Sequence, residues 1–362
     1  MQKENITSRS VLLLIVITAG TGNMLLAFPM EVEQDTWISI ILAFFWIIPI
    51  TMIYTRLIKL MPGRDIYEMA EAVAGKAGAK IVSFLFGFYC LHLSALVLGN
   101  HSEFIRLTSL HLTPLIVTTL VLCSVCAYMA KSGAETLAKW CVFVCALLAL
   151  TIIFASAYSR NVFDIENLTP VMNHSPGDIL KVSFKLVSIP FGEVVIILAL
   201  IGGLEKKSVT CKLFIVPMII VTAFSLLLFV RSCGILGVPA LKSAYFPDYK
   251  AVSLIKIGSF LERIEAILSS VYIIAGITKL TIALIGACRG AAKLFELPDY
   301  KTIVLPMCLL ASAFSIILFR NILEMFDFLN VYSIYALLFQ IIIPAALWIA
   351  AEIKAKRNTL PA

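Results

Sequence analysis

Two short stretches of the chain place polar and conformationally unusual residues inside long apolar runs. Residues 20–23 read Gly-Thr-Gly-Asn, and residues 188–193 read Ser-Ile-Pro-Phe-Gly-Glu. Glycine allows close backbone approach and proline removes a backbone donor, so both stretches are expected to interrupt a helix. Hydrocarbon cannot hydrogen-bond the backbone groups that such a break frees, whereas a bound ligand can. Two breaks at corresponding positions of two halves are typical of a transporter-type binding site.

The first stretch offers chemistry that suits an anionic group. Thr21 and Asn23 provide side-chain hydrogen bonds. A half-helix beginning near Asn23 would also present N–H groups and a positive dipole end to a carboxylate. Glycines at this spacing also occur in the packing seams of membrane helices, which is the alternative interpretation. The pairing with the second stretch favours a ligand site that includes Gly20, Thr21, Gly22 and Asn23.

The second stretch carries Glu193, a carboxylate at membrane depth. Such a group is a functional candidate because a charge in lipid is costly. Glu193 could meet a substrate ammonium, carry a coupling proton or pair with a buried lysine. A structural role as a cap of the broken helix is the alternative. Lys279 lies deep in a later apolar run, where it either pairs with Glu193, faces the carbonyls of the first helix, or snorkels to the interface.

The apolar run that contains Lys279 adds further candidate side chains. Glu262 and Glu265 are three residues apart and share a helix face. They suggest an outer gate, an ionic contact between helices, or a contact with a partner subunit. Tyr272 and Ala275 precede Lys279 by successive helical turns, so they are expected to line the pocket from the same helix.

The elements that must position these residues are membrane helices. The chain has 362 residues, of which 60% are hydrophobic and 14% charged, with a mean hydropathy of +0.98. This composition excludes a soluble globular domain and a disordered chain. Because a bilayer core of roughly 30 Å takes about 20 helical residues, the chain is expected to be an all-α polytopic membrane protein. We predict ten spans, approximately at residues 10–30, 37–60, 80–107, 113–129, 136–158, 179–203, 212–230, 259–287, 302–319 and 328–351.

An even number of spans places both termini on one side of the membrane. The polar segments on that side carry most of the Lys and Arg residues, which assigns both termini to the cytoplasm. The net charge of +7 therefore reflects the positive-inside rule, and nucleic acid is not expected as a partner. The segment before the first run is too polar for a signal peptide.

Three connecting segments have predicted roles of their own. Residues 67–73 suggest a short amphipathic helix at the inner membrane surface. Residues 251–257 form an apolar stretch too short to span, which is expected to lie across the outer mouth as a lid. Asp35 or Thr36 is expected to cap the second helix.

The two breaks lie about half a chain apart, so the two halves are comparable. Five helices separate them, and the second broken helix therefore enters the membrane from the opposite side. This predicts a single transmembrane domain over 1–362 with a five-plus-five inverted repeat, the first repeat at about 10–158 and the second at about 179–351. Spans one and six are the broken helices.

Residue patterns typical of enzymes do not occur in the sequence. The four histidines show no metal-ligand spacing, and no phosphate-binding loop is present. Cys123 and Cys126 form a CxxC pattern within one apolar run, and Cys141 and Cys145 lie in the next. A CxxC spacing inside a membrane helix, without histidine or carboxylate beside it, indicates packing rather than metal or redox chemistry. We expect no enzymatic activity, no cofactor and no metal.

Four motifs, taken in order, resemble the B subunit of GerA-type spore germinant receptors. They are Asp-Thr-Trp-Ile-Ser at 35–39, Asn-Leu-Thr-Pro-Val at 167–171, Pro-Phe-Gly-Glu at 190–193 and Phe-Leu-Glu-Arg-Ile-Glu at 260–265. The likeness runs over essentially the whole chain. That family resembles the amino acid-polyamine-organocation transporter superfamily, with unwound first and sixth helices in a LeuT-like fold.

The resemblance implies a protein of the spore inner membrane that works with A and C subunits and contacts membrane lipid. It would recognise a small germinant, usually an amino acid and in some cases a sugar or nucleoside, and start germination, with the termini on the spore core side. Carried over by position, the ligand-binding residues would be Gly20, Thr21, Gly22, Ile189, Phe191, Gly192 and Glu193, with Tyr89, Tyr272 and Ala275 from the third and eighth helices.

Two other functions fit the same pocket. A proton-coupled amino acid permease would use it without partner subunits, and Glu193 would then carry the proton. A subunit that itself forms an ion-conducting path is the alternative within signalling. Uptake into liposomes distinguishes the first from a receptor, and ligand-induced current distinguishes the second.

Overall fold

The computed structural model describes residues 6–204, 210–255, 264–319 and 321–358. In these ranges ten helical segments are long and apolar enough to cross a membrane, which confirms the predicted number of spans. Six spans are single helices, namely α3 (Thr36–Leu60), α4 (Ile66–Thr108), α5 (Leu115–Ser132), α6 (Ala134–Tyr158), α8 (Lys212–Ser243) and α10 (Ile264–Leu294).

The remaining spans are composite or are joined to short helical turns. Span one consists of α1 (Ser8–Gly20) and α2 (Gly22–Leu25), and span six of α7 (Pro176–Leu186), η4 (Val187–Phe191) and η5 (Gly192–Ala199). Span nine is η7 (Tyr300–Ile303) with α11 (Val304–Ile317), and span ten is α12 (Ile322–Leu337), η8 (Leu338–Ile342) and α13 (Ile343–Lys356). Short turns η1 (Glu33–Asp35), η2 (Ser159–Asn161), η3 (Ile165–Leu168) and α9 (Pro247–Val252) lie between spans.

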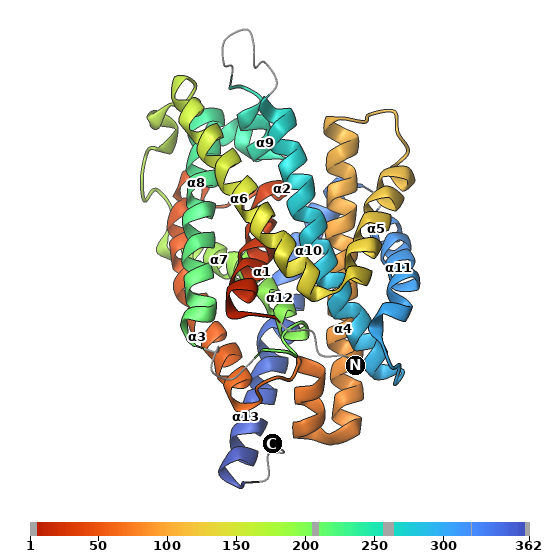
Figure 1. Cartoon of the computed structure of the whole chain (residues 1–362). Coiled ribbons are helices and arrows are strands. Elements are labelled where there is room, and N and C mark those ends of the chain that lie inside the picture. Colours follow the sequence, from red (N-terminus) through yellow and green to blue (C-terminus); the bar gives the residue numbers. More distant parts are fainter. Residues whose placement is uncertain (1–5, 205–209, 256–263, 320, 359–362) are drawn as a thin grey trace.

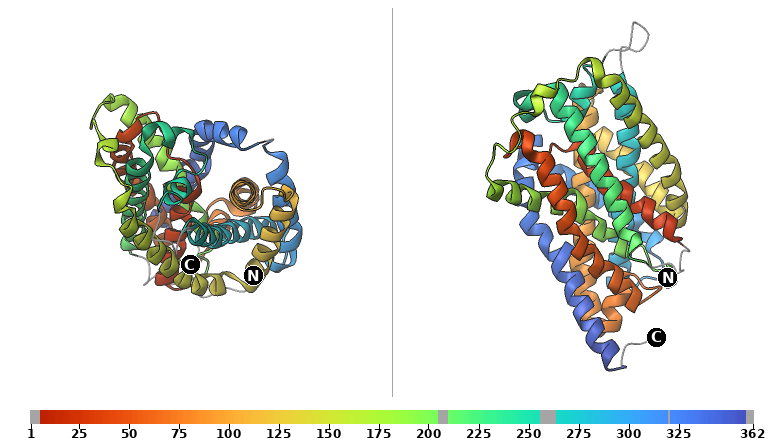
Figure 2. Two further views of the ribbon diagram at one scale, coloured as in Figure 1. Left: turned by 90° about the horizontal axis from the view of Figure 1, so that it is seen from above. Right: turned by 90° about the vertical axis from the view of Figure 1, so that its left-hand side faces the viewer.

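Helices α4 and α10 pack along each other for much of their length and form the centre of the helix packing. A Cβ atom added to Gly290 of α10 would lie 2.9 Å from the Cα of Gly87 of α4. The two backbones therefore touch at this crossing, which only glycine permits. At the lower end, α13 runs beside α3 (Figure 2), and the Arg56 Nε atom lies 2.6 Å from the Glu352 Oε1 atom.

Span three begins earlier than the predicted residue 80. Asp65 caps α4 in a capping box with Glu68, and the helix bends at Gly75, whose φ of 70° suits glycine. The predicted surface helix at 67–73 is wrong in its placement. Tyr67 is buried and its hydroxyl donates to the Gly286 carbonyl of α10 at 2.7 Å, so this segment packs inside the bundle.

The outer segment after span seven is also more helical than predicted. Helix α8 continues to Ser243 through a bend at Gly237, and α9 follows it. Helix α9 contacts α8, α10 and the short α2, and it lies with α2 near the upper end of the bundle, opposite α13 (Figure 1). This position agrees with a cover over the outer mouth, although the helix begins at Pro247 and residues 256–257 of the predicted lid lie outside the described residues.

Asp35 occupies the N-cap position of α3, but its side chain makes no cap bond to the helix, and the Thr36 hydroxyl donates to the Pro29 and Glu33 carbonyls instead. The Asp35 carboxylate accepts from the backbone N–H groups of Met172, Asn173 and His174, at 2.7, 2.8 and 3.1 Å. Asp35 therefore joins the start of span two to the loop before span six.

Candidate ligand site between the two helix breaks

The first break is narrower than the sequence predicts. Thr21 separates α1 from α2 but keeps near-helical dihedrals, and the chain becomes extended only at Leu26. The outer half-helix expected from Asn23 is therefore one turn long. A four-residue helix has too small a dipole to attract a carboxylate strongly, and Asn23 instead donates to the Ser225 hydroxyl at 2.5 Å.

The second break is a full interruption of the helix. Span six leaves the α-helix after Leu186, passes through the π-helical turn η4 and becomes extended at Ile189, with φ −132° and ψ 120°. A 3₁₀ helix, η5, then carries Gly192 and Glu193 in its first turn. Pro190 cannot donate a backbone hydrogen bond, which explains why the α-helix does not continue through it.

The two breaks meet at Gly22. A Cβ atom added there would lie 2.8 Å from Pro190 Cβ, 3.4 Å from Glu193 Oε2 and 3.5 Å from Lys279 Nζ. Span one therefore reaches span six and α10 at a single point, and a side chain at position 22 would push into that point. The glycine serves close approach here rather than a positive φ.

A buried ion pair lies at this meeting point. The Lys279 ammonium donates to Glu193 Oε2 at 2.6 Å, and the two side chains are 3% and 4% exposed. In this structure Lys279 pairs with Glu193 instead of snorkelling. Removal of either partner would leave a charge buried without compensation, so the two residues depend on each other.

A cavity of about 40 Å³ lies beside the ion pair. Its polar lining comes from Thr21, Gly22, Asn100, His101, Glu193 and Lys279, and its apolar lining from Leu26, Leu93, Leu96, Val97, Ile189, Met325 and Leu329. A space of this size holds water molecules but no amino acid. The site is thus closed around its charges.

Asn100 and His101 are site residues that the sequence reasoning missed. Asn100 is buried, and its Oδ1 atom has no hydrogen-bond partner among the described residues. His101 Nδ1 lies 2.8 Å from the Val97 carbonyl oxygen. The polar stretch Asn-His-Ser-Glu at 100–103, inside the predicted span 80–107, was the available signal for Asn100, because an unsatisfied buried oxygen is costly and needs a partner.

A larger cavity of about 350 Å³, called the vestibule below, lies above the breaks. Its walls include Gly22, Asn23, Ile189 and the charged residues Glu31, Lys185, Lys242 and Asp327. Lys185 forms an ion pair with Glu31. Leu26, Ile189 and Leu329 line this vestibule and also the small cavity, so three apolar side chains separate the two spaces.

Tyr89, Phe191 and Gly192 support the second break instead of lining either cavity. Gln340 donates to the Tyr89 hydroxyl at 3.0 Å and to the Ser188 carbonyl at 2.9 Å. A Cβ atom on Gly192 would lie 2.1 Å from Gln340 Oε1, so a glycine is needed there. Phe191 is fully buried. Gln340 is a further positioning residue that the sequence reasoning did not select.

Several other predicted residues also lie away from both cavities. Tyr272 donates its hydroxyl to Asp248 of α9, which in turn lies 2.5 Å from Arg231 of α8, so Tyr272 belongs to an outer ionic cluster. Ala275 and Glu265 are buried in α10 without lining either space, and Glu262 lies outside the described residues. Gly20 lines an apolar groove beside Phe224.

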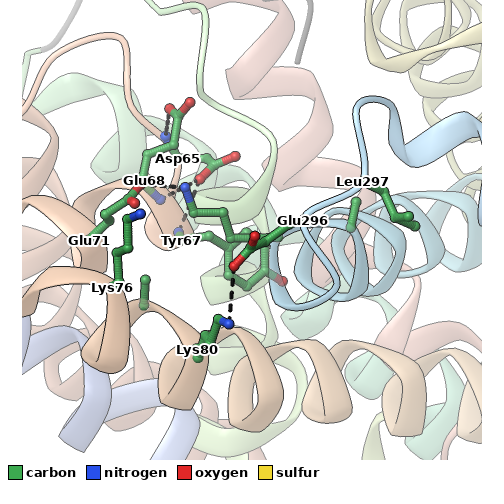
Figure 3. Close-up of a pocket in the computed structure, with 11 residues that line it drawn as sticks. Asp65, Tyr67, Glu68, Glu71, Lys76, Lys80, Glu296 and Leu297 are labelled. Atoms are coloured by element: carbon green, nitrogen blue, oxygen red, sulfur yellow. Dashed lines mark hydrogen bonds and ion pairs between the residues drawn. The ribbon is translucent and has the colours of Figure 1, made fainter.

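The opposite end of the bundle carries a charged pocket of about 330 Å³ between the start of α4 and the end of α10. Figure 3 shows Lys80 and Glu296 directed toward one another across it, at 3.1 Å. Burial, together with the neighbouring Glu68, raises the pKa of Asp65 in this pocket to about 6. Nearby, Arg289 donates to the Ala199 and Leu200 carbonyls at 3.1 and 3.2 Å and so holds the inner end of span six.

The arrangement of these helices matches solved transporters. The chain is similar to MhsT, solved in complex with L-phenylalanine, with a TM-score of 0.69 and 11% identity over 98% of this chain and 90% of that chain. It is also similar to Mhp1, a nucleobase-cation-symport-1 family transporter, with a TM-score of 0.64 and 13% identity over 92% and 76% of the two chains. The protein is therefore an integral multi-pass membrane protein with the LeuT-type fold.

The sequence comparisons specify the family within that fold. The model of the family described as spore germination protein matches residues 5–324, and the chain belongs to this family. Spore germination protein KB of Bacillus subtilis (strain 168) is 25% identical over 367 residues, which are 99% of this chain and 97% of that protein. Spore germination protein A2 of the same organism is 26% identical over 274 residues, 75% and 74% of the two chains.

Proposed function

We propose that this protein is the ligand-binding membrane subunit of a spore germinant receptor and that its ligand is a small amino acid bound at the bilayer midplane. The observation that carries the proposal is the buried Glu193–Lys279 pair at the meeting of two helix breaks, beneath a vestibule of about 350 Å³. A vestibule of this size accepts an amino acid, and family membership supports the role in germination. Binding would trigger germination.

The charges explain why an amino acid is the favoured ligand. A zwitterion carries one ammonium and one carboxylate, which are complementary to Glu193 and Lys279. Asn100 Oδ1, which lacks a partner among the described residues, supplies a second acceptor for the ammonium. The ligand would replace the direct contact of the pair with two contacts of its own, so it would satisfy all buried charges.

Entry of the ligand requires two rearrangements. Leu26, Ile189 and Leu329 must separate to join the vestibule to the small cavity, and the Glu193–Lys279 contact must open. The ligand therefore binds the open state better than the closed one. This difference in affinity shifts the population between the states and constitutes the signal.

Glu193→Gln tests the site directly. The ligand is first identified by a thermal-shift screen of the common amino acids on the purified protein in nanodiscs. We expect Glu193→Gln to weaken binding of that amino acid by about 10-fold or more in calorimetry, because a charge-assisted hydrogen bond is lost. Glu265→Gln, on another face of the bundle, serves as the matched control and should bind normally. Unchanged affinity in Glu193→Gln would refute the role of the ion pair.

The partners and the location belong to the same proposal. The relatives are germination proteins, which supports membership in a receptor complex with A and C subunits in the spore inner membrane, with both termini on the core side. Affinity purification of the tagged protein from spore inner membranes should recover two further subunits. Recovery of the chain alone would favour a solitary permease.

A proton-coupled amino acid permease is the second candidate, and the likeness to MhsT and Mhp1 supports it. In this case Glu193 would exchange its lysine partner for a proton during transport. Liposomes that contain only this protein should then accumulate labelled amino acid when a proton gradient is imposed. A receptor subunit would bind the same amino acid without accumulation, and a conducting subunit would instead show current on ligand addition.

A further inference from the structure

Two cysteine thiols from distant parts of the chain face each other inside the bundle. Cys123 of α5 and Cys308 of α11 have their sulfur atoms 2.8 Å apart. Each sulfur also lies close to the backbone oxygen of the other residue, at 3.2 Å for Cys123 and 3.1 Å for Cys308. The contact is reciprocal, so both side chains are held in position from two directions. Both cysteines are free thiols in this structure.

The two cysteines lie on helices that belong to different halves of the chain. Helices α5 and α11 are the fourth and ninth spans, and they are five spans apart, as are the two broken helices. Both pack against α4 and α10, which carry the site residues Asn100 and Lys279. A bond between the thiols would therefore join the two halves of the chain at equivalent helices.

We propose that Cys123 and Cys308 form a disulfide when the protein meets a peroxide. The Cys123 sulfur attacks a peroxide oxygen, the O–O bond breaks, and water leaves with the thiol proton to yield a sulfenic acid. The Cys308 sulfur then attacks the sulfenic sulfur, the S–O bond breaks, and a second water leaves with the Cys308 proton. Two electrons pass from the sulfurs to the peroxide, which is reduced to two water molecules.

Proximity makes this pair the site of the reaction. A disulfide bond is about 2.05 Å long, so the sulfurs need to approach by less than about 1 Å. The preorganised contact raises the effective concentration of one thiol at the other. The side chains are only 3% and 2% exposed, so the oxidant must be small and uncharged, as hydrogen peroxide is. The sulfur of Cys126, the other cysteine of the CxxC pattern, instead lies 3.7 Å from the Ile277 carbonyl oxygen of α10.

Thiol counting after oxidation tests the proposal. Purified protein in nanodiscs is treated with hydrogen peroxide, quenched with catalase, unfolded and alkylated with N-ethylmaleimide. We expect the wild type to lose two of its nine alkylatable cysteines and to give a cross-linked peptide containing Cys123 and Cys308. Dithiothreitol should restore both. Cys123→Ser and Cys308→Ser should each abolish the cross-link, whereas Cys141→Ser should retain it.

A stability measurement distinguishes a stabilising disulfide from overoxidation of the cysteines. The disulfide closes a loop of just over half the chain, so oxidation should raise the thermal midpoint of the wild type by ~3 °C or more and leave Cys123→Ser unchanged. A full complement of alkylatable thiols after peroxide, or sulfinic acid at either cysteine, would overturn the proposal. A cross-link between any other two cysteines would overturn it equally.

Discussion

At the scale of single residues, one contact determines the character of the site. Glu193 and Lys279 are each costly in a membrane interior, and the pair makes both tolerable. Gly22 is the third partner, since its missing side chain lets span one approach both charges. The electrostatics of the site therefore depend on a residue that contributes no charge.

Substitution within the pair should show strong coupling. Lys279→Met leaves Glu193 buried without its partner, so we expect a loss of about 3–5 kcal/mol in stability, measured as unfolding of the nanodisc-reconstituted protein. The double variant Lys279→Met with Glu193→Gln removes both charges and should recover most of that loss. Equal destabilisation of the single and double variants would contradict the coupling.

A second residue-scale prediction concerns pH at the inner pocket. The pKa of Asp65 is raised to about 6 by burial, with Glu68 adding repulsion and Arg289 opposing both. The folded state thus binds the proton more tightly than the unfolded state, and this residue's contribution to stability decreases as pH rises from about 4 through about 6.

Asp65→Asn removes this titration and keeps a good N-cap for α4. We expect the variant to gain about 1–3 kcal/mol over the wild type at pH 7.5 and to show no gain below about pH 4. Thermal unfolding across this pH range measures the difference. Glu296→Gln, in the same pocket but exposed, should not reproduce it.

At the scale of elements, short segments hold the long helices in place. Helix α9 is only six residues long, yet Asp248 at its start connects to Arg231 of α8 and Tyr272 of α10. The same helix contacts α2, which ends the first broken span. Asp248 therefore anchors α9 to α8 and α10, and α9 in turn contacts the first broken span.

Loss of that carboxylate should release the cover. Asp248→Asn leaves Arg231 buried without its ionic partner, so we expect hydrogen exchange across Pro247–Val252 to become at least about 10-fold faster. Ligand association and dissociation should both accelerate if the cover limits access. Exchange equal to that of the wild type would show that packing alone holds α9. Asp178→Asn, an exposed carboxylate on α7, is the control.

At the scale of the whole molecule, the fold places the binding chemistry between two charged ends. The vestibule opens beside α2 and α8, the charged pocket lies at the far end between α4 and α10, and the ion pair is between them. Under the proposed function, ligand would reach the ion pair from the vestibule. This holds for a receptor that senses its ligand and for a permease that carries it.

The orientation in the membrane can be tested by cysteine labelling. Cys211 is exposed at the start of α8, on the side that the distribution of basic residues assigns to the cytoplasm. A membrane-impermeant maleimide should label it in inside-out vesicles and leave it unlabelled in right-side-out vesicles. Ser243→Cys in a Cys211→Ser background, at the other end of α8, should show the reverse pattern. Labelling of Cys211 in right-side-out vesicles would show that the predicted orientation in the membrane is reversed.

Local patterns in the sequence were sufficient for the ten spans, the two breaks and the family, because apolar length and helix-breaking residues act within a few positions of themselves. Ile189 and Glu193 could be selected in this way. Other features depend instead on which faces of distant helices meet. They are the pairing of Glu193 with Lys279, the unpartnered Asn100 oxygen, the hydrogen bond from Tyr272 to Asp248, and the contact of Cys123 with Cys308. Such contacts arise from packing between segments far apart in the chain, and only the tertiary structure determines them.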